Sequence, residues 1–188
     1  MVSLAGPYGG SVKALKAIIS GEKFGLILLP QVKARNVEES FLSSYTLLPT
    51  YNYWEADKEI LITKERNYTV NDYRQLFDRI NYTIGYNLYN HANLQLLKPL
   101  TPPGVETHCL YGTNRPTIEK LDYSKSINSK PREIYGDGDG TVNLQSLAGC
   151  DSWQTNQKQS VFVQRWSDFG HKQIINEQQT FNYILNLT

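Results

Sequence analysis

Short apolar segments that end at glycine-rich turns alternate with helical patterns along this chain, and this alternation restricts the fold more than any other feature. Residues 2–5 form an apolar run before a Gly-Pro turn, and residues 105–111 form another between Pro-Pro-Gly and a glycine. Residues 160–166 alternate between two faces in the manner of a third strand. Helical spacing follows the first run, over residues 12–18. This order predicts an α/β fold with a mostly parallel sheet and flanking helices.

Further helices and one long loop are predicted around these strands. Ser11 is a candidate N-cap of the first helix, and Gly21 is its stop signal. The remaining predictions are a short helix from residue 36, helices over 71–80 and 82–97, a polar loop over 113–132, a short helix over 142–148, and an amphipathic terminal helix over 174–187. The longest apolar run, residues 24–30, is too short to cross a bilayer.

The charge of the chain is nearly balanced. Its 188 residues contain 19 basic and 18 acidic side chains, which leaves a net charge of +1 at pH 7. This balance provides no electrostatic footprint for nucleic acid, so a nucleic-acid partner is not expected. The length corresponds to one globular domain.

Two features suggest the secretory pathway. Three N-x-S/T sequons, at Asn67, Asn81 and Asn186, are candidate glycosylation sites. The only cysteines, Cys109 and Cys150, are either two buried thiols or one disulfide that closes a long loop. The first six residues lack a signal peptide, so we expect that Met1 is not the natural start of the protein.

Two loops that follow predicted strands carry residue types suited to catalysis. Asp137 and Asp139 lie in a glycine-rich loop after one strand, and His171 follows the last strand. An acid followed by a histidine in this order matches the end of an α/β-hydrolase triad, in which the histidine transfers protons and the acid orients it. The alternatives are a solvated acidic turn and a surface histidine. An EF-hand is a poor fit, because Ala148 occupies the position that requires a bidentate glutamate.

The nucleophile of such a triad is not evident. No G-x-S-x-G motif occurs, and Ser11 has the position of a helix cap. The other histidines fit the base less well, because His91 lies on a polar helix face and His108 lies within a strand. In the hydrolase order the nucleophile precedes the strand over residues 2–5, so we expect it upstream of Met1.

Three stretches resemble the lecithin:cholesterol acyltransferase family, and most of all its lysosomal group XV phospholipase A2 branch. They are VSLAGPYGGS at residues 2–11, PGVETHCLYG at 103–112 and YGDGDGTVN at 135–143. The resemblance covers the whole chain but only the C-terminal half of the family's protein. It implies that Asp139 is the triad acid, that His171 is the base, and that Cys109 and Cys150 form a disulfide.

The resemblance also implies a division of the chain. Residues 1–20 would hold a core strand and helix of the hydrolase, residues 21–100 a lid and cap insertion, and residues 101–188 the C-terminal core with the triad acid and base. The segment from about residue 21 to residue 44 would form the lid over an acyl pocket. Residues 24–29 would then face lipid, with burial in the core as the alternative.

The implied activity is that of a lipid acyl hydrolase and O-acyltransferase. A serine attacks a glycerophospholipid ester, and the acyl group passes to water, a sterol or ceramide, with no cofactor or metal. The implied partners are phospholipid and lipid-alcohol substrates and, peripherally, a membrane or lipoprotein surface; the implied location is lysosomal or extracellular. Without its serine, the chain alone is expected to be inactive. The alternatives are a non-catalytic lipid-binding or vestigial module and a metal site built from Asp137, Asp139 and His171.

Overall fold

The computed structural model describes residues 1–22, 30–93 and 100–187. The strands are β1 (Val2–Leu4), β2 (Leu61–Thr63), β3 (Asn67–Tyr68), β4 (Thr107–Thr113), β5 (Thr117–Tyr123), β6 (Arg132–Gly136) and β7 (Val161–Ser167). The helices are α1 (Val12–Ser20), α2 (Gln31–Glu38), α3 (Leu42–Thr46), α4 (Tyr73–Arg79), α5 (Thr83–His91), α6 (Leu144–Leu147), α7 (Trp153–Asn156) and α8 (Gln178–Leu185). Two 3₁₀ helices, η2 (Ala148–Ser152) and η3 (Ile174–Asn176), complete them. The predicted lipid-facing segment, residues 24–29, lies outside the described residues.

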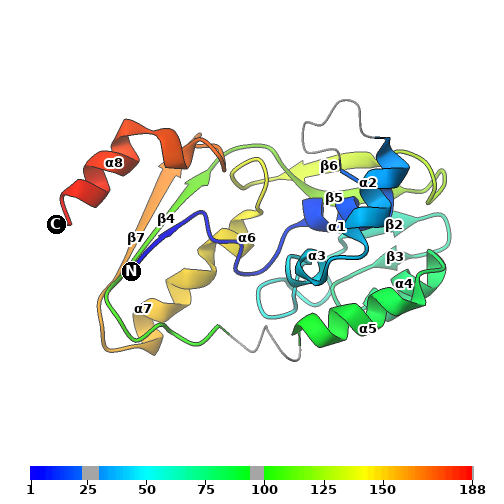
Figure 1. The fold of residues 1–188 in the computed structure, drawn as a ribbon, viewed down its shortest axis with the longest axis horizontal. Helices are drawn as coiled ribbons and strands as arrows, with labels where there is room; N and C mark the ends of the chain where they lie inside the picture. Colours follow the sequence, from blue (N-terminus) through cyan, green and yellow to red (C-terminus); the bar gives the residue numbers. More distant parts are fainter. Residues whose placement is uncertain (23–29, 94–99, 188) are drawn as a thin grey trace.

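One sheet is entirely parallel and has the order β1-β4-β7. In the view of Figure 1, α8 lies to one side of β4 and β7, and α6 and α7 lie to the other. A buried apolar cluster that includes Leu110, Leu147 and Trp153 packs these helices against the strands. The prediction of an α/β fold with a parallel sheet and flanking helices is confirmed.

A second sheet has the order β3-β2-β5-β6, in which only β2 and β5 are parallel. It lies at the other end of the molecule, together with α1 to α5 (Figure 1). A larger buried cluster, which includes Leu15, Leu61 and Leu121, joins α1 to this sheet. Because β2 pairs with β5, the predicted insertion over residues 21–100 and the segment over 101–188 share a sheet.

The predicted polar loop over residues 113–132 is wrong, because β5 occupies Thr117–Tyr123. The charged residues of this strand interrupt the apolar pattern, so the sequence did not indicate a strand here. Glu119 and Lys120 form ion pairs across to Lys58 and Glu59, at 2.6 and 2.8 Å. The side chain of Leu121, between these charges and Tyr123, is fully buried. The strand therefore combines partly exposed charged side chains with apolar side chains that enter the core.

The predicted helices are found with shifted ends. Ser11 caps α1 and accepts a hydrogen bond from the Lys13 amide, and Gly21 ends it at φ +78°, both as predicted. Helix α2 begins at Gln31 rather than at residue 36. The predicted terminal helix is interrupted, because Glu177 adopts an extended conformation between η3 and α8.

Three other predictions need smaller corrections. Helix α4 begins at Tyr73, within the predicted range 71–80. Helix α5 ends at His91, whereas the prediction extended into residues that the structure does not describe. The first strand is less buried than predicted, since Val2 is 38% exposed and β1 pairs with one described strand, β4. No helix in the described part of the chain has the length and apolarity needed to span a membrane.

Candidate active site

The loop after β6 holds the carboxylate of Asp139 inside the protein. The Asp139 side chain is fully buried, and its Oδ1 accepts hydrogen bonds from the amides of Thr141 at 3.0 Å and Val142 at 2.8 Å. Two glycines make this tight loop possible: a Cβ on Gly138 would lie 2.3 Å from the Val142 carbonyl oxygen, and Gly140 has φ +86°. A buried carboxylate is costly unless it is hydrogen-bonded, and here the backbone supplies donors.

The loop after β7 brings His171 onto this carboxylate. The His171 amide donates to the Asp139 carbonyl oxygen at 2.8 Å, and the imidazole Nδ1 lies 2.7 Å from Asp139 Oδ2. Because an ionised carboxylate only accepts hydrogen bonds, Nδ1 carries the proton and donates. The imidazole is 30% exposed, whereas the carboxylate is not exposed at all. Asp139 therefore fixes the ring and leaves Nε2 for another partner.

A cavity of about 150 Å³ lies beside the imidazole. Its lining is Pro7, Ser11, Lys13, Ala14, Leu47, Thr141, Val142 and His171. In the described part of the chain no residue forms a hydrogen bond with His171 Nε2. The cavity thus joins an apolar wall, one lysine and the free nitrogen of the imidazole.

The Gly-Gly-Ser turn before α1 is tied to the acid loop. The Ser11 hydroxyl donates to the Thr141 carbonyl oxygen at 2.5 Å and accepts from the Lys13 amide at 3.2 Å. The Gly9 amide donates to the Ser146 hydroxyl at 2.8 Å. Since its hydroxyl is occupied on both sides, Ser11 acts as a cap and a tether.

The other candidate residues lie apart from this pair. Asp137 Oδ1 accepts from the amides of Asn114 and Gly138, both at 2.6 Å, and so braces the loop. His108 lies within β4 and contacts the Tyr183 hydroxyl through Nδ1 at 3.0 Å. His91 is exposed at the end of α5. Among the described residues, no group of three or more His, Cys, Asp and Glu side chains is placed to hold a metal ion.

The two cysteines are brought together as thiols. Both are buried in the cluster against the parallel sheet. Interaction with the Cys150 thiol lowers the pKa of Cys109 despite burial, whereas interaction with the Cys109 thiol and burial both raise the pKa of Cys150. The disulfide that the resemblance implies stays a prediction. The sequon residues Asn67, Asn81 and Asn186 are all exposed, and their glycosylation also stays a prediction.

Comparison with known proteins gives this geometry a context. The sequence model of the lecithin:cholesterol acyltransferase family matches residues 1–178. The chain belongs to this family. It is 36% identical to the human lysosomal phospholipase A and acyltransferase over 184 residues, which cover 97% of this chain and 44% of that protein. It is 38% identical to the chicken phosphatidylcholine-sterol acyltransferase over 179 residues, which cover 93% of this chain and 42% of that protein. The chain therefore spans less than half the length of these curated relatives.

Sequence reasoning identified the Asp139–His171 contact but missed most of the cavity beside it. Lys13 was placed only by its position in the first helix, and Leu47 lies in a segment that showed no clear pattern. The signal for Lys13 was its place two residues after Ser11, in the first turn of helix α1, which begins against the acid loop. No comparable signal exists for Leu47.

Proposed function

We propose that this chain supplies the acid and the base of a serine-type lipid acyl hydrolase and O-acyltransferase. The observation that carries the proposal is the 2.7 Å contact between His171 Nδ1 and the buried carboxylate of Asp139. A histidine held in this way accepts a proton from a serine through Nε2 and later returns it to the leaving group. Asp139 selects the tautomer and stabilises the imidazolium that forms.

The nucleophile is assigned to protein outside these 188 residues. Ser11 does not fit the role, because its hydroxyl is committed to Thr141 and Lys13. We propose that the serine and the oxyanion donors come from the part of the protein that corresponds to the unmatched half of the relatives. On this proposal the chain alone does not turn over lipid.

The substrate is proposed to be a glycerophospholipid, with transfer of its acyl group to water, a sterol or ceramide. The relatives' names describe phospholipase and acyltransferase activities on lipids. The apolar cavity beside His171 suits the start of an acyl chain, and Lys13 places a positive charge at its edge. We retain the proposal that residues 21–100 form a lid and cap insertion, and that the protein acts in the lysosome or outside the cell.

A chimera tests this function. The N-terminal part of the human relative, up to the start of the match, is joined to this chain, and release of fatty acid from phosphatidylcholine is measured. We expect hydrolysis that His171→Ala lowers by about 10⁶-fold. The matched control His91→Ala removes an exposed imidazole and retains the activity. Equal activity of the two variants would refute the assignment of His171.

A non-catalytic lipid-binding module is the second candidate. It is favoured by one observation, that within the described residues Nε2 of His171 has no hydrogen-bonding nucleophile. Phospholipid hydrolysis by the chimera distinguishes the two, because a module that has lost its catalytic alignment restores no activity when a serine is supplied.

A further inference from the structure

The loop between β5 and β6, residues 124–131, is surrounded by hollows that lie apart from the Asp139–His171 pair. Three cavities of about 290, 560 and 220 Å³ lie against it. Lys130 lines the first and second, Asn128 the first and third, and Lys125 the second and third. Because neighbouring cavities share these residues, they form one continuous surface, called here the hairpin-loop surface.

The hairpin-loop surface is strongly positive. The charged side chains that line it are six cations and two carboxylates: Arg35, Lys64, Arg79, Lys125, Lys130, Arg132, Glu65 and Asp122. Their sum of +4 exceeds the net charge of +1 of the entire chain. The positive charge of this protein is therefore concentrated around one loop.

The arginines of this surface form ion pairs, whereas its lysines form none within the described part of the chain. Arg79 pairs with Glu65 at 2.9 Å and Arg132 with Asp122 at 2.7 Å, and Arg35 pairs at 2.6 Å with Glu39, outside the lining. Within the described residues, the exposed ammonium groups of Lys64, Lys125 and Lys130 form no ion pair. Three cations are thus available to an external anion.

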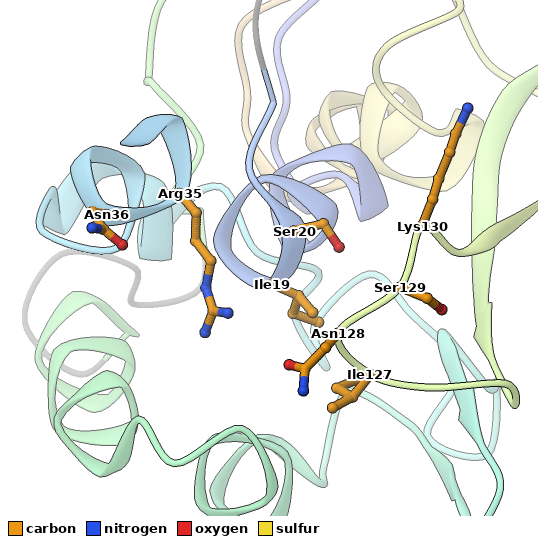
Figure 2. Close-up of a pocket in the computed structure, with 8 residues that line it drawn as sticks. All are labelled: Ile19, Ser20, Arg35, Asn36, Ile127, Asn128, Ser129 and Lys130. Carbon is orange, nitrogen blue, oxygen red and sulfur yellow. The ribbon is translucent and has the colours of Figure 1, made fainter. Parts of the chain in front are cut away.

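The shape of the loop does not depend on these lysines. The Ser129 hydroxyl donates to the Ser126 carbonyl oxygen at 2.7 Å, and the Asn128 amide donates to the Ser126 hydroxyl at 3.2 Å. Figure 2 shows Arg35 reaching from α2 toward the loop, while Lys130 extends away from Ile19 and Asn128. The loop is held by its own serines and presents its lysines outward.

We propose that the hairpin-loop surface docks on an anionic lipid surface, with Lys64, Lys125 and Lys130 as the main contacts to lipid phosphates. Several hollows distributed around one loop fit several headgroups at once better than they fit one soluble phosphate ester. The proposal rests on the proposed function, because a protein that acts on lipids meets its substrates at a lipid–water interface.

Vesicle co-sedimentation of the 188-residue chain tests the docking surface. The probes are vesicles of phosphatidylcholine alone and of phosphatidylcholine mixed with phosphatidylserine, each at low and physiological salt. We expect binding to the mixed vesicles that weakens with salt. Lys125→Ala with Lys130→Ala should weaken it about 30-fold, since each lysine near an anionic membrane contributes roughly fivefold. Both lysines are exposed, and circular dichroism verifies that the variant is folded.

The matched control removes two exposed lysines elsewhere, Lys158 and Lys172, and should bind as the unmodified chain does. Equal weakening by the two double variants, or no binding to the mixed vesicles, would overturn the proposal. Displacement by glycerophosphate at the concentration of exposed lipid phosphate would also overturn it, in favour of a soluble ligand. None of these binding measurements depends on lipid hydrolysis. Failure of the docking proposal can therefore be distinguished from failure of the proposed function in the chimera.

Discussion

At the scale of single residues, the acid loop shows how a buried charge is accommodated. Asp139 accepts from two backbone amides and from His171, and its own amide donates to the Val142 carbonyl oxygen at 3.2 Å. These bonds require a chain reversal within four residues, and Gly140 provides it at φ +86°. The glycines around Asp139 are thus part of the site, because their backbone conformation orients the carboxylate toward His171.

Gly140→Ala should lower the free energy of unfolding by about 1–2 kcal/mol. A Cβ at this position has space, since its nearest neighbour would be 4.0 Å away, so the loss comes from the positive φ alone. Gly170→Ala is the control, because that glycine has no positive φ and its closest neighbour would lie 3.5 Å away. Urea unfolding of both variants measures the difference. Equal stability would show that the acid loop adopts another conformation.

At the scale of elements, helix α1 connects the acid loop to the core of the second sheet. Its N-terminus is tied to the acid loop through Ser11, and its buried face packs into the cluster against β5. The cap of this helix therefore has two functions. It satisfies a backbone donor of α1, and it holds the acid loop beside the cavity.

Ser11→Ala should lower the free energy of unfolding by about 1–2 kcal/mol, as the loss of a serine N-cap does. Ser43→Ala, at an exposed position of α3, should change it by less than about 0.5 kcal/mol. In the chimera, Ser11→Ala should retain phospholipid hydrolysis. Complete loss of hydrolysis with an intact fold would identify Ser11 as the nucleophile and contradict the assignment made here.

The junction of α1 and α2 contains a carboxyl group that makes stability depend on pH. Burial raises the pKa of Glu38 from 4.5 to about 6, while the Glu22 amide that donates to Oε2 at 3.0 Å opposes this shift. Its Oε1 is buried and finds no hydrogen-bond partner among the residues that the structure describes. Because the folded state binds this proton more tightly than the unfolded state, Glu38 lowers stability as the pH rises from about 4.5 to 6.

Glu38→Gln should therefore stabilise the protein by about 1 kcal/mol at pH 7 and have little effect at pH 4. Comparing the variant with the unmodified chain at each pH cancels the other titrating groups. The exposed Glu55→Gln serves as the control and should change stability at neither pH. A gain of the same size at both pH values would show that the effect is not one of ionisation.

At the scale of the whole molecule, residue chemistry was easier to predict than packing. The sequence predicted that Asp139 and His171 each follow a strand, and the structure brings the two residues into contact although β6 and β7 belong to different sheets. It missed β5, because Glu119 and Lys120 interrupt the apolar pattern, and in the folded chain their charges are paired across to Lys58 and Glu59. The cavity was also missed, because its walls come from segments about 130 residues apart that meet only in the folded chain.

The central claim, that Asp139 and His171 act as one unit, is tested most directly by a double-mutant cycle on phosphatidylcholine hydrolysis in the chimera. Asp139→Asn should lower kcat/KM by about 10⁴-fold and His171→Ala by about 10⁶-fold, and the double variant should be about as active as the less active single variant. Asp57→Asn, an exposed acid, should leave the rate unchanged. Losses that multiply in the double variant, or an Asp139→Asn variant as active as Asp57→Asn, would contradict the account.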